Sequence, residues 1–182
     1  MMDELLSRSS ASSFEAGGPS DEEIDLMLQA AVRAPDHGKL RTWRFWVVKG
    51  DARLRLSEWY GEAALRRDPA VSAASIEKEK SKPLRSAVTI VIGACIQRGH
   101  KIPEIEQVLA AGAAAMNILN AAHALGYGAK WVTGANCYDE GFKQNLGLDP
   151  ADPIVGIIHI GTKQPGGPPV ERPDPWDFTT TL

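Results

Sequence analysis

The stretch QAAVRAPDHGKLRTWRFWVVKG, Gln29 to Gly50, decides how the rest of the chain is arranged. It starts as the end of an amphipathic helix, which Pro35 stops because its ring cannot continue the helix and favours an extended residue before it. A charged loop follows, and the chain then enters a strand rich in tryptophan. Such a loop on a rigid scaffold is a common place for ligand binding. From composition alone the simpler interpretation is a solvated connection, in which Asp36 caps a turn while His37 and Lys39 face water.

Composition limits the class of protein. The chain has 182 residues, 43% of them hydrophobic, so we expect a single domain over residues 1–182. Its net charge of −3 provides no basic face for nucleic acid. No apolar run could span a membrane, and the polar segment Met1–Glu4 is no secretory signal, so a cytoplasmic location is predicted. The two cysteines, Cys95 and Cys137, are expected in or near the core.

Caps and periodicity predict the elements of the first half. Ser20 and Glu23 have the spacing of a capping box and open a helix that runs to about Arg33. Trp59 and Tyr60 are compatible with the core or with a lid over a site, and the sequence does not choose between them. The other expected elements are a short helix at 3–7, a strand at 44–48, a helix from 51 and a charged helix at 69–82.

The second half contains two apolar, β-branched runs, 87–95 and 154–160, that predict strands covered on both faces. Between them we expect a long helix from Pro103 to near Gly126, a strand at 129–133 and a short helix at 139–146. The mid-helix Gly112 predicts close packing of another segment against the long helix. The proline-rich residues 163–182 predict an extended arm that buries Trp176 and Phe178 against a partner. Together these elements indicate an α+β fold with a central mixed sheet flanked by helices.

Two further points exclude other sites. The four histidines are scattered and no cysteines are paired, so no metal site is predicted. No G-x-G-x-x-G motif follows a strand, so the chain lacks the fingerprint of a dinucleotide-binding fold.

Three groups of residues together resemble the nitroreductase family. The pattern Arg33-Ala34-Pro35 through Trp43-Arg44-Phe45 is similar to the family's first flavin-binding loop, and its short single-domain members carry R-A-P-D-H here. Arg8 with Ser10 resembles the family's N-terminal R-R-S, with Ser9 in place of the second arginine. The segment from Trp131 to Gly134 resembles the part that passes beside the flavin ring, with Val132 where close relatives often have arginine.

The resemblance implies FMN as the cofactor and assigns residues to it. Arg8, Ser9 and Ser10, with Arg172, would hold the phosphate, and the backbone of Trp131, Val132 and Thr133 would line the ring. Lys39 and Arg41 fall where the family places an amide pair near the pyrimidine edge, and there they could offset negative charge. Arg33 and His37 would reach the flavin from the partner subunit of a homodimer whose C-terminal arms are exchanged.

The implied activity is hydride transfer from NAD(P)H through the flavin to a nitroaromatic or quinone-like acceptor, in ping-pong order, with no catalytic side chain required. Alternatives on the same fold are another flavin reaction, such as dehydrogenation, dehalogenation or flavin reduction. A non-catalytic flavin-binding dimer is a further alternative, favoured by the missing arginines. A flavin-free structural dimer is the third.

Overall fold

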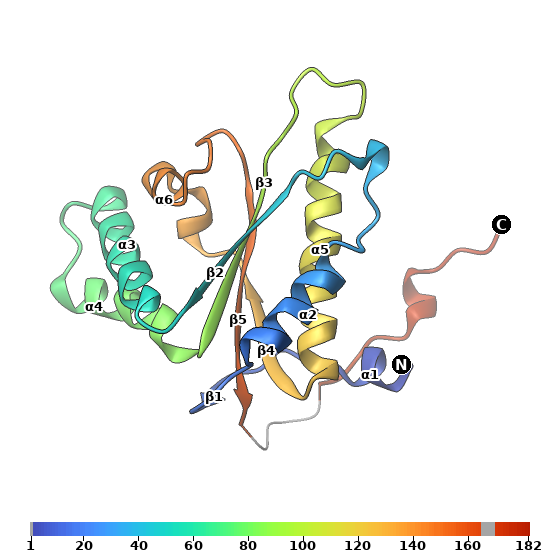
Figure 1. Ribbon diagram of the computed structural model, residues 1–182, viewed down its shortest axis with the longest axis horizontal. Coiled ribbons are helices and arrows are strands. Elements are labelled where there is room, and N and C mark those ends of the chain that lie inside the picture. The colour runs from blue at the N-terminus through green and yellow to red at the C-terminus, as the bar shows by residue number, and fades with distance from the viewer. Residues whose placement is uncertain (1, 165–169) are drawn as a thin grey trace.

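The computed structural model describes residues 2–164 and 170–182, which form helices on both sides of one five-stranded sheet (Figure 1). The helices are α1 (Met2–Ser7), α2 (Asp21–Ala31), α3 (Ala52–Arg67), α4 (Ala73–Ser81), α5 (Glu104–Ala124) and α6 (Glu140–Asn145). The strands are β1 (Phe14–Glu15), β2 (Trp43–Lys49), β3 (Val88–Ala94), β4 (Tyr127–Val132) and β5 (Ile154–Lys163). Short 3₁₀ helices occupy His37–Lys39, Lys82–Arg85, Ala135–Tyr138 and Pro175–Phe178.

The sheet is organised around β5. Strand β3 pairs with β5 and β2 pairs with β3, while β4 and the short β1 also pair with β5, and all of these pairs are antiparallel. The predicted α+β class is confirmed. The parallel pairing expected of a mixed sheet is confined, among the described residues, to one isolated bridge between Ser10 and Ala129.

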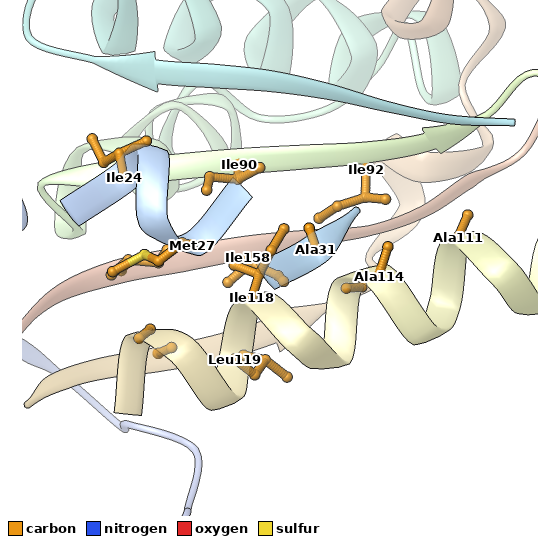
Figure 2. Close-up of a cluster of buried hydrophobic side chains, with 14 of the residues drawn as sticks. Ile24, Met27, Ala31, Ile90, Ile92, Ala111, Ala114, Ile118, Leu119 and Ile158 are labelled. Atoms are coloured by element: carbon orange, nitrogen blue, oxygen red, sulfur yellow. The ribbon is translucent and has the colours of Figure 1, made fainter. Parts of the chain in front are cut away.

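Helices α2 and α5 cover one face of the sheet (Figure 1). Helix α2 begins with the predicted capping box, since the Ser20 side chain accepts from the Glu23 N–H and the Glu23 carboxylate accepts from the Ser20 N–H. Figure 2 shows that the apolar stripe of α2 meets the facing stripe of α5 over the central strands. Side chains in this cluster include Ile24, Met27 and Ala31 from α2, Ile90 and Ile92 from β3, Ala111, Ala114, Ile118 and Leu119 from α5, and Ile158 from β5.

Helices α3, α4 and α6 lie on the opposite side of the sheet in Figure 1, and α3 and α6 build a second core there. Phe142 of α6 is fully buried and meets Tyr60 edge to face, with ring centroids 5.5 Å apart. The Trp46 indole N–H donates to the Leu146 carbonyl at 2.9 Å, which ties β2 to the end of α6. Tyr60 is therefore a core residue, whereas Trp59 is half-buried at the edge of this cluster.

Several predicted boundaries are corrected. Helix α4 starts at Ala73 rather than 69, because Asp68 accepts the Ala70 N–H in a turn and Ser72 then caps the helix. Strand β4 starts earlier than predicted, at Tyr127, directly after Gly126 ends the chain reversal with φ 86°. The tight contact expected at Gly112 is not made within the described chain, where an added Cβ would come no closer than 4.0 Å to Val155.

The C-terminal arm is described only in part. Its residues Pro165, Gly166, Gly167, Pro168 and Pro169 lie outside the described residues, as does Met1. Residues 170–182 extend away from the sheet (Figure 1), with Trp176 69% exposed and Phe178 78% exposed. No helix in the described ranges has the length and apolarity to cross a membrane. Residues 2–164 and 170–182 also contain no group of three His, Cys, Asp or Glu side chains placed to hold a metal ion.

Candidate functional site

A cavity of about 660 Å³ opens on the face of the sheet that carries α3 and α4. Its volume falls within the range of roughly 300–1,000 Å³ that is usual for small-molecule sites. The N-terminal segment 12–14 forms one wall, and Val132 with residues 134–136, just after β4, forms another. Tyr60, Ile157 and His159 come from α3 and β5, and charged side chains come from α4, the 3₁₀ helix after it and β4.

The predicted phosphate-binding residues of the N-terminal segment precede residues 12–14, which line this cavity. Ser10 forms its bridge with Ala129 of β4, and the Ala11 N–H donates to the Ala129 carbonyl at 2.9 Å. The guanidinium Nη2 of Arg172 donates to the Arg8 carbonyl at 2.7 Å, although the two residues are 164 positions apart in sequence. The fold therefore brings Arg8, Ser9, Ser10 and Arg172 to one edge of β4.

Strand β4 also positions the predicted ring-binding segment. The Ala129 carbonyl points away from β5 toward the N-terminal segment, and main-chain direction repeats every second residue in a strand, so Trp131 presents its main chain at the same outer edge. The Trp131 ring packs on the α5 side of the sheet, with its N–H donating to the Val155 carbonyl at 3.3 Å. Val132 faces the cavity on the other side, and Thr133 follows at the exposed end of the strand.

The loop after α2 lies elsewhere. His37 Nδ1 is 2.6 Å from Glu106 Oε2, near the start of α5. The Asp36 carboxylate accepts from the Arg41 N–H at 2.8 Å, so Asp36 does cap this turn. Lys39 and Arg41 adopt left-handed backbone conformations, with φ 54° and 52°, which cost non-glycine residues free energy and often occur at functional sites.

Helix α5 separates the two groups of predicted residues. Glu106 contacts His37 near one end, and His123, 17 residues on, lies 3.0 Å from Ser7 Oγ near the other. At 1.5 Å per residue this separation is about 25 Å along the helix. Figure 1 shows α1 at one end of α5 and the His37 loop at the opposite end. Arg33, which is exposed just after α2, belongs to the His37 group, as do Lys39 and Arg41.

Sequence reasoning missed the charged residues of the cavity. Lys82, Arg85 and Lys130 line it, together with Glu79, whose Oε1 is 2.5 Å from Lys82 Nζ. Lys130 could have been predicted from the sequence, because side chains alternate along a strand and Lys130 therefore shares a sheet face with Val132. The sequence offers no such indication for residues 79 to 85, because a run of alternating charges also fits a solvated helix.

His159 is the second missed group. It lies on β5, where Nδ1 is 3.2 Å from Ser86 Oγ and 3.1 Å from Thr89 Oγ1. Burial, and then the positive charges of Lys130 and Arg85, lower the pKa of His159 to about 4. The imidazole is therefore neutral at neutral pH. The sequence marked this strand only as buried on both faces, which hid a polar wall on one side.

An apolar stripe on α5 faces away from the sheet. Ile105 and Leu109 are each 63% exposed and Met116 is 38% exposed, with Gly112 between them. Their spacing of four, three and four residues places all four on one side of the helix. A row of exposed large apolar side chains of this kind is a candidate interaction surface.

Comparisons with known proteins show the family to which the chain is similar in sequence. The family model described as the nitroreductase family matches residues 5–162. The Escherichia coli (strain K12) protein named as the NAD(P)H nitroreductase YdjA is 34% identical over 181 residues, covering 97% of this chain and 96% of that protein.

Solved structures share the fold. A nitroreductase-like family protein from Bacillus cereus superposes with a TM-score of 0.85 at 22% identity, covering 100% of this chain and 95% of that one. A nitroreductase with bound FMN from Bacteroides fragilis superposes with a TM-score of 0.75 at 16% identity, covering 100% and 97%.

Proposed function

The chain belongs to the nitroreductase family, and on that premise we propose that it is an FMN-dependent oxidoreductase that uses NAD(P)H to reduce nitroaromatic or quinone-like acceptors. The observation that carries the proposal is the convergence of Arg8, Ser10 and Arg172 on the outer edge of β4, beside a cavity of about 660 Å³. Cationic and short hydroxyl donors suit a phosphate, and an open strand edge beside a cavity offers main-chain contacts to a flat ring.

The residues present fit FMN. Arg8 and Arg172 supply guanidinium groups and Ser9 and Ser10 supply hydroxyls for the phosphate. The free edge of β4 at Trp131 supplies main-chain donors and acceptors near the cavity mouth, where Val132 offers an apolar contact. A tricyclic ring attached to a phosphate at Arg8 would thus find both polar and apolar partners on the same strand.

The proposed site is completed by a second copy of the chain. Within one chain the His37 loop and the Arg8 segment contact α5 at points about 25 Å apart along the helix. A two-fold axis across the exposed stripe of α5 would bring the start of one α5 helix close to the end of the other. Arg33, His37, Lys39 and Arg41 would then approach the flavin held by Arg8 of the other copy.

The C-terminal arm suits the same assembly. Trp176 and Phe178 are exposed, and burying such large aromatic side chains is energetically favourable. An arm from residue 163 that crosses to the partner would bury both. The dimer would also cover Ile105, Leu109 and Met116 and supply the close neighbour that Gly112 lacks within one chain. One interface would therefore account for three separate features of the chain.

FMN held by Arg8, Ser10 and Arg172 would supply the hydride-transfer chemistry between NAD(P)H and the acceptor. The protein's part is to hold the ring, to expose one face of it to each substrate in turn and to limit water. If both substrates used the one cavity, the oxidised nicotinamide would leave before the acceptor enters, which is ping-pong order. The cytoplasmic location remains a prediction from the sequence.

The visible spectrum of the purified protein, before and after addition of NADH or NADPH, tests the proposal. We expect a yellow protein that is bleached by the nicotinamide and regains its colour with a nitroaromatic acceptor. Double-reciprocal plots at several acceptor concentrations should give parallel lines. A colourless protein that cannot be reconstituted with FMN would refute the assignment.

A second candidate function is a flavin-binding dimer without turnover. It is favoured by Ser9 and Val132, which stand where family members often carry arginine, because fewer cations would hold and tune the cofactor less strongly. Bound flavin that neither nicotinamide reduces would support this candidate. Turnover with an acceptor of another class would instead support a different flavin reaction on the same fold.

A further inference from the structure

The cavity carries more positive than negative charge among its described lining residues. Its carboxylate, on Glu79, is paired with Lys82 at 2.5 Å. Arg85 donates through Nη2 to the neutral hydroxyl of Ser81 at 2.9 Å. Within residues 2–164 and 170–182 neither Arg85 nor Lys130 forms an ion pair. Two positive charges at the cavity are therefore uncompensated.

His159 joins these two cations. It pairs directly with Lys130 across β4 and β5, and both line the cavity. The hydroxyl of Ser86 or of Thr89 can donate to Nδ1 in the tautomer that carries its proton on Nε2, and in that tautomer Nε2–H is the free donor. In the described part of the chain Nε2 has no hydrogen-bond partner. Burial lowers the pKa of His159 most, and the positive charges of Lys130 and Arg85, which line the same cavity, lower it further.

We propose that Arg85, Lys130 and the Nε2–H of His159 form a subsite for a carboxylate on the electron acceptor. The acceptors would then be anionic nitroaromatic or quinone-type acids, in preference to their uncharged analogues. This inference rests on the proposed function, because it names the substrate class of the same cavity. Two cations and a neutral N–H donor match an anionic oxygen, and apolar Val132 and Ile157 offer surface to an aromatic ring.

The cofactor phosphate has a separate set of donors. Arg8, Ser10 and Arg172 gather at the edge of β4 beside Ala129, whereas Lys130 projects from the sheet face into the cavity. Ser10 lies at the edge of β4, in the plane of the sheet, whereas the Lys130 side chain points out of that plane. A group held by Lys130 is therefore displaced from a group held by Ser10. The cavity cations therefore remain available to a second molecule.

A binding measurement tests the subsite without turnover. The FMN-loaded protein, labelled at histidine, is titrated with pH by NMR alone, with 4-nitrobenzoate and with uncharged nitrobenzene, and His159→Gln assigns the resonance. A bound carboxylate stabilises the imidazolium, so 4-nitrobenzoate should raise the pKa of His159 while nitrobenzene leaves it unchanged. The other charged or titratable groups around the cavity are Lys82 and Arg85 after α4, Glu79 from α4, Lys130 from β4 and Tyr60 from α3.

Two outcomes of this titration would overturn the subsite. One is a His159 titration that 4-nitrobenzoate does not move. The other is a rise in the pKa of His159 when FMN alone is added to the FMN-free protein, because Arg85 and Lys130 would then contact the cofactor. If the protein binds no FMN, the proposed function fails, and the same titration with 4-nitrobenzoate on the colourless protein still decides the subsite.

Substrate preference supplies a second test. Arg85→Met and Lys130→Met should each lower the ratio of kcat/KM for 4-nitrobenzoate over nitrobenzene by roughly tenfold, as expected for the loss of one hydrogen bond to a charged group. Lys78→Met is the matched control, because it removes an exposed cation of α4 that does not line the cavity. Equal losses on both acceptors, or an equal change in the control, would contradict a carboxylate subsite.

Discussion

At the scale of single residues, the backbone of the loop after α2 is strained at two of the predicted flavin-binding residues. Lys39 and Arg41 are the non-glycine residues with positive φ in the described chain, and both were predicted from the resemblance to approach the flavin. Each such conformation costs of order 1–3 kcal/mol and persists only where the surroundings enforce it. Here Asp36 enforces it through the Arg41 N–H. The strain is consistent with a loop shaped for a ligand, and its contact with FMN stays a prediction.

Arg8→Ala should weaken the retention of FMN. A lost charge-assisted hydrogen bond to the phosphate corresponds to about 1.5–3 kcal/mol, or roughly a 10- to 100-fold higher dissociation constant. Fluorescence titration of the apoprotein with FMN measures this change. Arg55→Ala is the control, because Arg55 is an exposed arginine of α3 that stacks on Trp59 and is not among the predicted phosphate-binding residues. Unchanged retention in Arg8→Ala would remove Arg8 from the site.

His159 predicts a fall in stability at acidic pH. Its pKa is near 6.5 in the unfolded chain and about 4 in the folded one, so between these values the unfolded state binds more protons. Its contribution is complete above pH 6.5 and is lost as the pH decreases toward 4, by about 3 kcal/mol in all. Urea unfolding of the wild type and His159→Gln across this range measures it. An equally steep decline in the variant would show that other groups cause the loss.

At the scale of elements, α5 has two different faces. Its small inner side chains let the sheet and α2 approach closely, while its outer stripe leaves Ile105, Leu109 and Met116 exposed. The sequence indicated a core or interface helix from its alanine content but could not divide the faces. That division depends on which side the sheet occupies, and in the folded chain Gly112 is half-buried, with Val155 of β5 the nearest neighbour of an added Cβ at 4.0 Å.

Leu109→Asp should convert a dimer into monomers. The buried charge would be unpaired at the proposed interface, whereas at an exposed position of a monomer it would cost little. Sedimentation would then give half the mass, and bound FMN should be released with it. Leu54→Asp on α3, where the leucine is 58% exposed, is the matched control. A variant that keeps both its mass and its flavin would exclude this face as the interface.

The capping box of α2 predicts a smaller effect. Ser20→Ala removes the acceptor of the Glu23 N–H and should lower the free energy of unfolding by about 1 kcal/mol. Glu23 also accepts from the Tyr127 hydroxyl at 2.7 Å, so the cap links α2 to β4. Thermal and urea unfolding measure the change, with Glu22→Gln in the same turn as the control. No difference between the two variants would mean that the cap does not stabilise the fold.

At the scale of the whole molecule, the proposed site belongs to two chains. Arg8 and His37 lie near opposite ends of α5, so each copy would give its phosphate-binding end to one flavin and its loop to the other. A site shared in this way would explain why the residues predicted to bind one flavin form two separate groups in the folded chain.

Mixing two variants tests the shared site. Arg8→Ala and His37→Ala homodimers should both bind FMN poorly, but a mixed dimer has one site with both changes and one with neither. After unfolding and refolding the two together, random pairing should restore about a quarter of the sites. The flavin bound per chain measures the recovery. Recovery would be absent if Arg8 and His37 served the same site from one chain, or if His37 served none.

The sequence by itself determined the α+β class, most elements to within a few residues and the family motifs. Local signals carry this information: Pro35 after the helix, a capping box at Ser20 and β-branched runs at 87–95 and 154–160 act over a few residues. They predicted where helices and strands occur but not their exact starts, as α4 and β4 showed.

Only the tertiary structure decided which residues meet. It brought Arg172 to Arg8, separated both from His37, and gathered Lys82, Arg85, Lys130 and His159 around one cavity. These placements depend on the order and direction of strands around β5, which join residues far apart in sequence. Periodicity cannot encode that order, because a buried strand looks the same in sequence whichever neighbours it pairs with.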